Sequence, residues 1–390
     1  MKRISKDSDP RILLISRHDS FTKLAVRYAL LLKQYGWDVN LLILNPKLIP
    51  QRILSSVVDT LNNAAIPTVQ ASDVDIKKYD ALFFLITGGI LKKLAIDWSL
   101  QSPDRPFIIS AYPGLIYQNV FDGFISRSLS DLILLPSEFD LQNYYKFCRR
   151  FDLTPVAVTS GFFSNSKFDC LEDVSKEDFV FSEQSVAPNT ILERKYLSKK
   201  LVDFAKAIAP RKLYISQRVK EGEPALFKTK FSIVDGIESI GKPGNLIFTN
   251  RPALSLIRSG ASSLTVSSTV GVEALEFTDR SYFIKDFGPS EQVGGDFFVD
   301  SGTYVSFEDL IKGKRPTVDL EWKRQHYELL YPEFINKVFL ELIRSPQKYG
   351  IGNYAKVISE ELATFPHSKI PSRKPTHKIR RWLFSLFTRS

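Results

Sequence analysis

The sequence predicts an α/β protein built from two Rossmann-like domains that face a central cleft and a basic amphipathic C-terminal tail. Three observations support this fold class. The chain of 390 residues exceeds the length at which one hydrophobic core usually stops growing. Short apolar runs alternate with segments of helical periodicity, which is typical of parallel sheets. The alternation stops in a polar stretch, residues 164–185, and then starts again.

The first half opens with a strand, a polar turn, a helix that ends at Gly36 and a second strand. Its expected strands are residues 11–16, 38–44, 80–87, 106–111, 131–136 and 155–159, and its clearest helices are residues 21–35 and 138–149. Continuous apolar strands of this kind are expected in a parallel sheet that is covered on both faces.

The second half repeats the pattern. Its expected strands are residues 212–216, 245–249, 263–267 and 281–284, and its expected helices are residues 190–208 and 270–277, followed by helical stretches within 306–363. We therefore expect an acceptor domain over residues 1–165, a donor domain over 186–365 and a tail over 366–390. Ligands of parallel sheets bind beyond the carboxyl ends of strands, so the loops there are the candidate sites.

The net charge of +10 comes mainly from the tail. Seven of the 53 basic residues lie between 366 and 390, where there is no Asp or Glu, and the rest of the chain has 46 basic and 43 acidic residues. A nearly neutral body argues against nucleic acid as a partner. Within the tail, basic residues alternate with Trp, Leu and Phe over 377–389, which favours an anionic membrane surface. A disordered tail, or a helix docked on the body, is the alternative.

The chain lacks an apolar signal segment and a run long enough to span a membrane, so we expect a cytoplasmic protein that is peripheral to the inner face of the plasma membrane. Cys148 is expected in the core. The four histidines have no metal-ligand spacing, and Asp73 and Asp75 lie in a weakly patterned stretch. The prediction is therefore a metal-independent protein without a cofactor.

The segment Ser267-Ser268-Thr269 brings three hydroxyl groups from a strand to the start of a helix that contains Glu273. Free N–H groups and the helix dipole favour an anion at such a position, and an ordinary helix cap is the alternative. In the next candidate loop, Arg218, Lys220 and Glu223 follow a strand. Their cations could bind phosphate, although a solvated charged loop fits the pattern equally well.

His18 and Asp19 follow the first strand. Asp19, or His18 as second choice, could act as the general base on an acceptor hydroxyl. Alternatively, Asp19 or Ser20 only caps the first helix. Pro113 and Gly114 follow another strand and offer backbone N–H groups at the cleft, or form a plain turn.

The segment SSTVGVEAL, residues 267–275, resembles a motif in the C-terminal domain of GT-B glycosyltransferases that build surface polysaccharides, including the polysialyltransferase-like and Kdo-transferase-like groups. Three further segments are similar to a glycosyltransferase family known mainly from sequence. They are AYPGL (111–115), DLILLPSE (131–138) and YISQRV (214–219) with Gly222-Glu223. The family's usual lysine near Arg218 is replaced here by Ser216 or Gln217.

The resemblance implies transfer of a sugar from a nucleotide-sugar to a cell-surface glycan or a lipid-linked acceptor. It implies donor contacts from the residues of the 218–223 and 267–273 segments. Substrate contacts are expected from Pro113, Gly114, Ser137 and Glu138. Two alternatives remain open on the same architecture: a nucleotide-sugar epimerase, and a non-catalytic subunit of a glycan-assembly complex.

Overall fold

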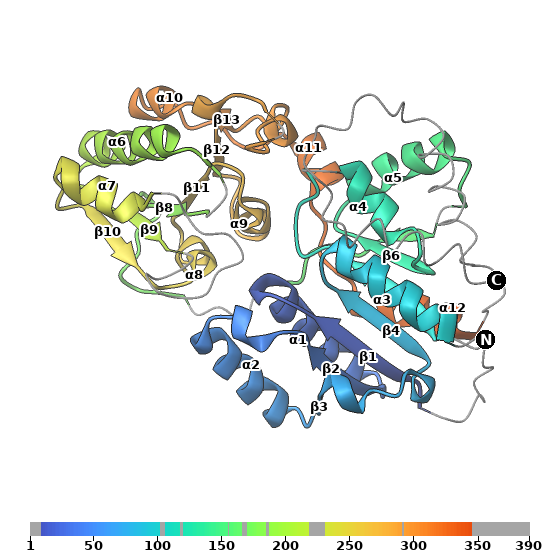
Figure 1. The fold of residues 1–390 in the computed structure, drawn as a ribbon. Coiled ribbons are helices and arrows are strands. Elements are labelled where there is room, and N and C mark those ends of the chain that lie inside the picture. Colours follow the sequence, from blue (N-terminus) through green and yellow to red (C-terminus); the bar gives the residue numbers. More distant parts are fainter. Residues whose placement is uncertain are drawn as a thin grey trace, which may run out of the picture.

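The computed structural model contains two parallel sheets, each covered by helices on both faces (Figure 1). It describes residues 9–101, 106–117, 120–154, 156–165, 170–184, 187–217, 231–290 and 292–344. The 218–223 segment and the tail, with the predictions made for them, lie outside the described residues. This two-domain α/β architecture confirms the predicted fold class.

The N-terminal sheet has seven strands in the order β3-β2-β1-β4-β5-β6-β7. They are β1 (Arg11–Ser16), β2 (Asp38–Ile43), β3 (Thr68–Val69), β4 (Ala81–Leu85), β5 (Phe107–Ala111), β6 (Leu132–Leu135) and β7 (Ala157–Thr159). Chain order reverses between β1 and β4, which are neighbours with Ser16 opposite Leu85. Ligands of open parallel sheets bind at this kind of reversal.

Helices α1 (Asp19–Gln34) and α2 (Gln51–Asn63) cover one face of this sheet, and α3 (Gly88–Gln101), α4 (Val120–Arg127) and α5 (Glu138–Arg150) cover the other. The burial of alternate strand residues toward the two sides explains the continuous apolar runs. Cys148, a residue of α5, lies in the core as predicted.

The C-terminal sheet has six strands in the order β10-β9-β8-β11-β12-β13. They are β8 (Phe179–Ser182), β9 (Leu213–Ser216), β10 (Leu246–Thr249), β11 (Ser262–Thr265), β12 (Ser281–Ile284) and β13 (Tyr304–Val305). Its helices are α6 (Ile191–Ile208), α7 (Ile233–Ile240), α8 (Ala253–Arg258), α9 (Thr269–Glu273) and α10 (Phe307–Ile311). Here the chain order reverses between β8 and β11.

Two features differ from the expected domain boundaries. Strand β8 belongs to the second sheet although it precedes residue 186. After α11 (Leu320–His326), helix α12 (Pro332–Arg344) returns to the first half, where Phe339 packs on Phe83 and the Trp37 indole donates to Asn336 at 2.9 Å (Figure 1). The amphipathic face of α12 is therefore buried by the N-terminal core, not by the domain that precedes it in sequence.

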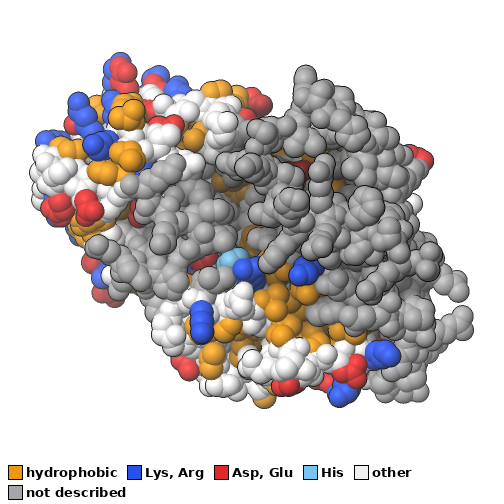
Figure 2. Space-filling model, in the orientation of Figure 1, with side chains coloured by type: hydrophobic (Ala, Val, Ile, Leu, Met, Phe, Trp, Pro, Cys, Tyr) orange, Lys and Arg blue, Asp and Glu red, His pale blue; other side chains and the backbone are white. Residues whose placement is uncertain are grey.

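Charges of both signs cover the C-terminal half. Figure 2 shows Lys and Arg side chains interspersed with Asp and Glu over the α6 and α7 part of the visible face. Within the described part of the chain, no helix combines the length and apolar character needed to span a bilayer.

Candidate active site

The two halves contact each other through the carboxyl ends of their strands. A Cβ atom added to Gly114, in the loop after β5, would lie only 2.4 Å from the Oγ1 atom of Thr269, the first residue of α9. An apolar cluster extends this contact, with Leu115 and Tyr117 from the first half against Val272 and Phe297 from the second. The structure therefore brings two of the predicted segments, 113–114 and 267–269, into contact where the halves meet.

His18 lies directly after β1, at the chain reversal of the N-terminal sheet. Its backbone has φ 69° and ψ 163°, a region that non-glycine residues occupy at a cost of about 1–3 kcal/mol and that is found mainly at functional sites. The side chain is 5% exposed. Its Nδ1 atom is buried and finds no hydrogen-bond partner in the described part of the chain.

Burial lowers the pKa of His18, and the charge of Arg17 lowers it further, whereas Asp19 acts in the opposite direction. The neutral imidazole, which is the basic form, is therefore favoured down to a lower pH than for an exposed histidine. Asp19 is the first residue of α1, and the N-cap is His18, whose side chain makes no capping bond. The interpretation of Asp19 or Ser20 as the helix cap is therefore wrong.

The Ser267–Thr269 segment lies at the chain reversal of the second sheet. The Ser267 N–H donates to the Gln184 side chain at 2.9 Å, which ties the end of β11 to the end of β8, and Ser267 is only 1% exposed. The Ser268 hydroxyl accepts from the Val270 N–H as the N-cap of α9. The capping alternative is thus correct for Ser268, while Ser267 is buried in the support of the loop. Thr269 is the hydroxyl residue that faces the other half.

Gly271 explains how α9 approaches its own sheet. A Cβ atom there would lie 2.6 Å from the Phe283 ring and 2.8 Å from the Thr265 methyl group. Glycine is therefore needed for this close packing of α9 on β11 and β12.

Glu273 lies at the other end of α9, where the second half meets α1. Burial raises the pKa of its carboxyl group to about 7, against the opposing charge of Arg27. Arg27 also donates to the Ser164 carbonyl at 2.8 Å, and the nearby Glu276 carboxylate accepts from the Asn165 N–H at 2.7 Å. Glu273 therefore belongs to a polar cluster at the connection between the halves.

Ser137 is the N-cap of α5. Its hydroxyl donates to Asp140 Oδ2 at 2.6 Å and accepts from the Asp140 N–H, and the residue is buried. Strand β6, which precedes it, is three places from β1 in the sheet, roughly 14 Å at the usual strand spacing. The structure therefore shows Ser137 as a support of α5, and a contact of Ser137 with substrate stays a prediction.

Glu138 follows Ser137 as the first residue of α5. It lines a pocket of about 780 Å³ between α5 and α11, whose other lining residues are Phe139, Gln142, Asn143, Lys146, Arg324, Gln325, Tyr327 and Glu328. No other predicted site residue lines this pocket. A ligand there would therefore not contact His18, Gly114 or Thr269.

Asp140 provides a prediction about stability. Burial raises its pKa from 3.8 to about 7 in the folded protein. The folded state consequently binds a proton that the unfolded state has lost, so stability should fall as the pH rises from about 4 to 7. We expect Asp140→Asn to be more stable than the wild type at pH 8 by roughly 1–3 kcal/mol, the desolvation penalty of a buried polar group, because the amide oxygen can keep the hydrogen bond from Ser137 without burying a charge. Urea unfolding at pH 4.5 and pH 8 tests this, and an unchanged difference at the two pH values would contradict it.

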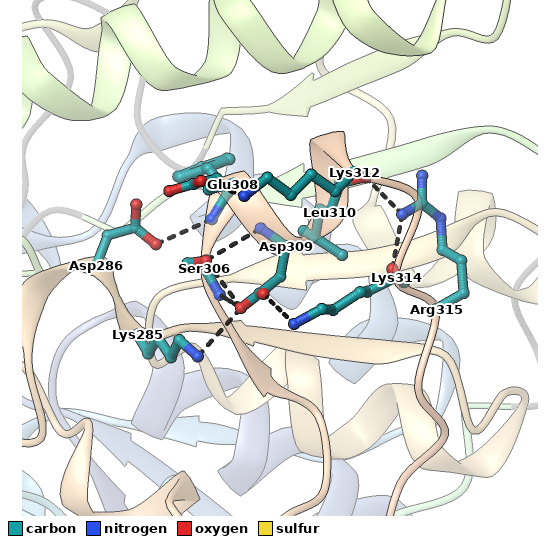
Figure 3. Close-up of polar contacts among 10 residues, drawn as sticks. Lys285, Asp286, Ser306, Glu308, Asp309, Leu310, Lys312, Lys314 and Arg315 are labelled. Atoms are coloured by element: carbon teal, nitrogen blue, oxygen red, sulfur yellow. Dashed lines mark hydrogen bonds and ion pairs between the residues drawn. The ribbon is translucent and has the colours of Figure 1, made fainter.

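A second polar cluster at the carboxyl edge of the C-terminal sheet is already satisfied (Figure 3). The Asp309 carboxylate accepts from Lys314 at 2.6 Å and from the Ser306 hydroxyl at 2.8 Å, and Lys285 pairs with it at 3.1 Å. These contacts hold the pKa of Asp309 far below its usual range. Both lysines are thus committed to a carboxylate, which makes them poor candidates for donor phosphate.

Two facing parallel sheets with equivalent strand orders, in contact at their carboxyl edges, define a protein of the GT-B type. Residues 12–330 match the family model described as "Putative glycosyltransferase (DUF6716)", so the chain belongs to that family. This match confirms the predicted resemblance to a glycosyltransferase family. The likeness to polysialyltransferases and Kdo transferases stays a prediction.

Solved structures share the fold. A 2-epimerase-type structure from Listeria monocytogenes, described as a putative UDP-N-acetylglucosamine 2-epimerase, has a TM-score of 0.58 at 10% identity and covers 87% of this chain and 97% of its own. Glycyrrhiza uralensis UGT73P12, complexed with glycyrrhetinic acid 3-O-monoglucuronide, has a TM-score of 0.50 at 10% identity and covers 97% and 98%. No curated protein sequence matches the chain. Identities this low establish a common fold only.

Proposed function

We propose that the protein transfers a sugar from a nucleotide-sugar to a hydroxyl group of a cell-surface glycan or lipid-linked acceptor. The observation that carries the proposal is His18. It is a buried histidine in a strained backbone conformation at the chain reversal of the N-terminal sheet, and one ring nitrogen finds no partner among the residues that the structure describes. A neutral imidazole at such a position is suited to take a proton from an acceptor hydroxyl.

The arrangement of the halves supports separate binding of two substrates. The acceptor would bind beside His18 and Gly114, and the donor would bind at the chain reversal of the second sheet near Thr269. Because Thr269 contacts the Gly114 loop, the two substrates would meet where the halves touch. Arg218, Lys220 and Glu223 remain proposed donor contacts, as does Glu273.

The base is proposed to be His18 instead of Asp19. Asp19 is the first residue of α1, and its negative charge stabilises the helix there because it lies at the positive end of the helix dipole. His18 has no such structural role, since its side chain makes no capping bond.

We further propose that no metal is required, because helix-terminal N–H groups and basic side chains can stabilise a leaving phosphate. Attachment to the inner face of the membrane through residues 377–389 is proposed on their composition.

A thermal-shift screen with CMP, UDP, GDP and their sugars tests the donor site. A nucleotide that binds only the folded protein stabilises it by about 2.7 kcal/mol at a hundredfold excess over Kd. We expect one nucleotide to raise Tm, with a smaller shift in Thr269→Ala and in Arg218→Ala. The matched control is Thr60→Ala, because the Thr60 hydroxyl only bonds the Ser56 carbonyl within α2. Equal shifts in wild type and Thr269→Ala would remove Thr269 from the donor site, and no shift with any nucleotide would favour the non-catalytic subunit.

A further inference from the structure

Arg127, the last residue of α4, is a buried cation that pairs with no anion among the described residues. Its side chain is 4% exposed. One terminal nitrogen donates to the Gly123 carbonyl at 3.3 Å and the other to the Ile86 carbonyl at 3.2 Å, while the buried Nε atom has no partner in the described part of the chain. The guanidinium carbon lies 3.8 Å from the centre of the Tyr112 ring. Among the described residues no carboxylate forms an ion pair with Arg127, an unusual condition for a buried charge.

The start of α3 lies against this guanidinium group. A Cβ atom on Gly88, the first residue of α3, would be 2.5 Å from the Ser126 Cβ atom and 3.4 Å from Arg127 Nη1, so α4 covers the helix start on the Gly88 side. Ile90 and Leu91 donate to the Thr87 carbonyl, so the N–H groups of Gly88 and Gly89 are the donors available at the helix start. A Cβ atom on Gly89 would meet nothing within 4 Å. The helix start is therefore open to an approaching ligand on the Gly89 side.

The same helix start lies at the chain reversal of the N-terminal sheet. Thr87 and Gly88 follow β4, and β4 pairs with β1, which leads to Arg17 and His18. The Nε atom of Arg17 is also buried without a partner in the described part of the chain. The Arg127 guanidinium, which bonds the Ile86 carbonyl, and the start of α3 thus lie beside the strand end that leads to the proposed base.

We propose that Gly88, Gly89 and Arg127 form an anion-binding subsite for a phosphate or carboxylate group of the acceptor. Helix-terminal N–H groups and a guanidinium fork both suit oxyanions. The inference rests on the proposed function, since it assumes that an acceptor binds in the N-terminal half. Anchoring the anionic group there would place the rest of the acceptor beside His18, at the end of the neighbouring strand.

The test compares binding of glucose 1-phosphate, methyl glucuronoside and uncharged methyl glucoside by calorimetry at fixed ionic strength. We expect the wild type to bind at least one of the anions and to bind it at least tenfold more tightly than the glucoside. Gly89→Asp should weaken that binding at least tenfold, because it places a negative charge at the helix start, where a carboxylate is compatible with the fold. Gly244→Asp is the matched control. Gly244 is also unobstructed but precedes β10, at the amino end of the other sheet.

Binding of the phosphate alone would identify a phosphorylated acceptor, and binding of the glucuronoside alone would identify an acidic sugar. The subsite is refuted if neither anion binds more tightly than the glucoside, or if Gly89→Asp binds the anion as the wild type does. The nucleotide-induced rise in Tm is measured on the same preparations. A nucleotide-induced rise in Tm in Gly89→Asp shows that the variant keeps its fold and its donor site. If the wild type shows no such rise, the proposed function fails, while the comparison of anion and glucoside binding still decides the subsite.

Discussion

Replacing His18 with glutamine is expected to lower kcat by about 10²–10⁴-fold, the range in which general bases contribute. Glutamine is similar in size and polar, but it cannot accept the proton of an attacking hydroxyl group. Nucleotide binding should persist, because His18 lies in the N-terminal half. Steady-state kinetics with the donor found in the thermal-shift screen, together with that Tm shift, measure both effects.

The pH dependence adds a second readout for the same residue. Because burial and Arg17 lower the pKa of His18, the wild-type kcat/KM should fall only below the ordinary histidine pKa of about 6.5. This acid limb should be missing from His18→Gln. Asp19→Asn serves as the comparison, and we expect it to retain most activity. A loss in Asp19→Asn that equals or exceeds the loss in His18→Gln would return Asp19 to the role of base.

The second large effect is expected at the contact between the halves. Gly114→Ala would place a methyl group 2.4 Å from Thr269 Oγ1, so one half must shift or the Thr269 side chain must turn away. Overpacking of this kind costs about 1–3 kcal/mol. We expect a lower Tm and a strong loss of activity, because the proposed donor and acceptor sites would no longer meet in the same geometry.

A double-mutant cycle isolates that contact. Thr269→Ala removes the two nearest atoms and leaves only its Cβ, at 3.3 Å, so the double variant should regain most of the stability lost in Gly114→Ala. Gly244→Ala, where an added Cβ meets nothing within 4 Å, controls for the loss of a glycine. Additive effects of the two substitutions on Tm would show that Gly114 and Thr269 do not touch in solution.

Much of the fold could be predicted from local pattern, because buried parallel strands are continuous apolar runs. The expected strands at residues 11–16 and 281–284 coincide with β1 and β12, and the other expected strands agree within two residues. Strand β8 was missed because its four residues lie in a polar stretch, and β3 and β13 because they have two residues each. The return of α12 depends on contacts such as that between Trp37 and Asn336, nearly 300 residues apart, which no local pattern reveals.

The candidate site was predictable to the level of loops. The loops of His18, Gly114 and Thr269 could be selected from the sequence because they follow strands, and strand ends of parallel sheets converge on one edge. The sequence could not separate facing residues from supporting ones. Ser137 and Ser268 fit both a cap and a ligand contact, and the structure shows them as caps. No sequence pattern marked Arg127 as a site residue. Its burial without a carboxylate partner among the described residues is visible only in the three-dimensional structure.

The most direct test of the account is to follow both products of the reaction with a donor chosen by the thermal-shift screen. The protein is incubated with that nucleotide-sugar and with a panel of glycan and lipid-linked acceptors, and mass spectrometry follows the sugar and the nucleotide. Glycosyl transfer predicts free nucleotide together with an acceptor that has gained one sugar, and neither product with His18→Gln. Conversion of the nucleotide-sugar to an epimer without any acceptor would contradict the account and identify the protein as an epimerase on the same fold.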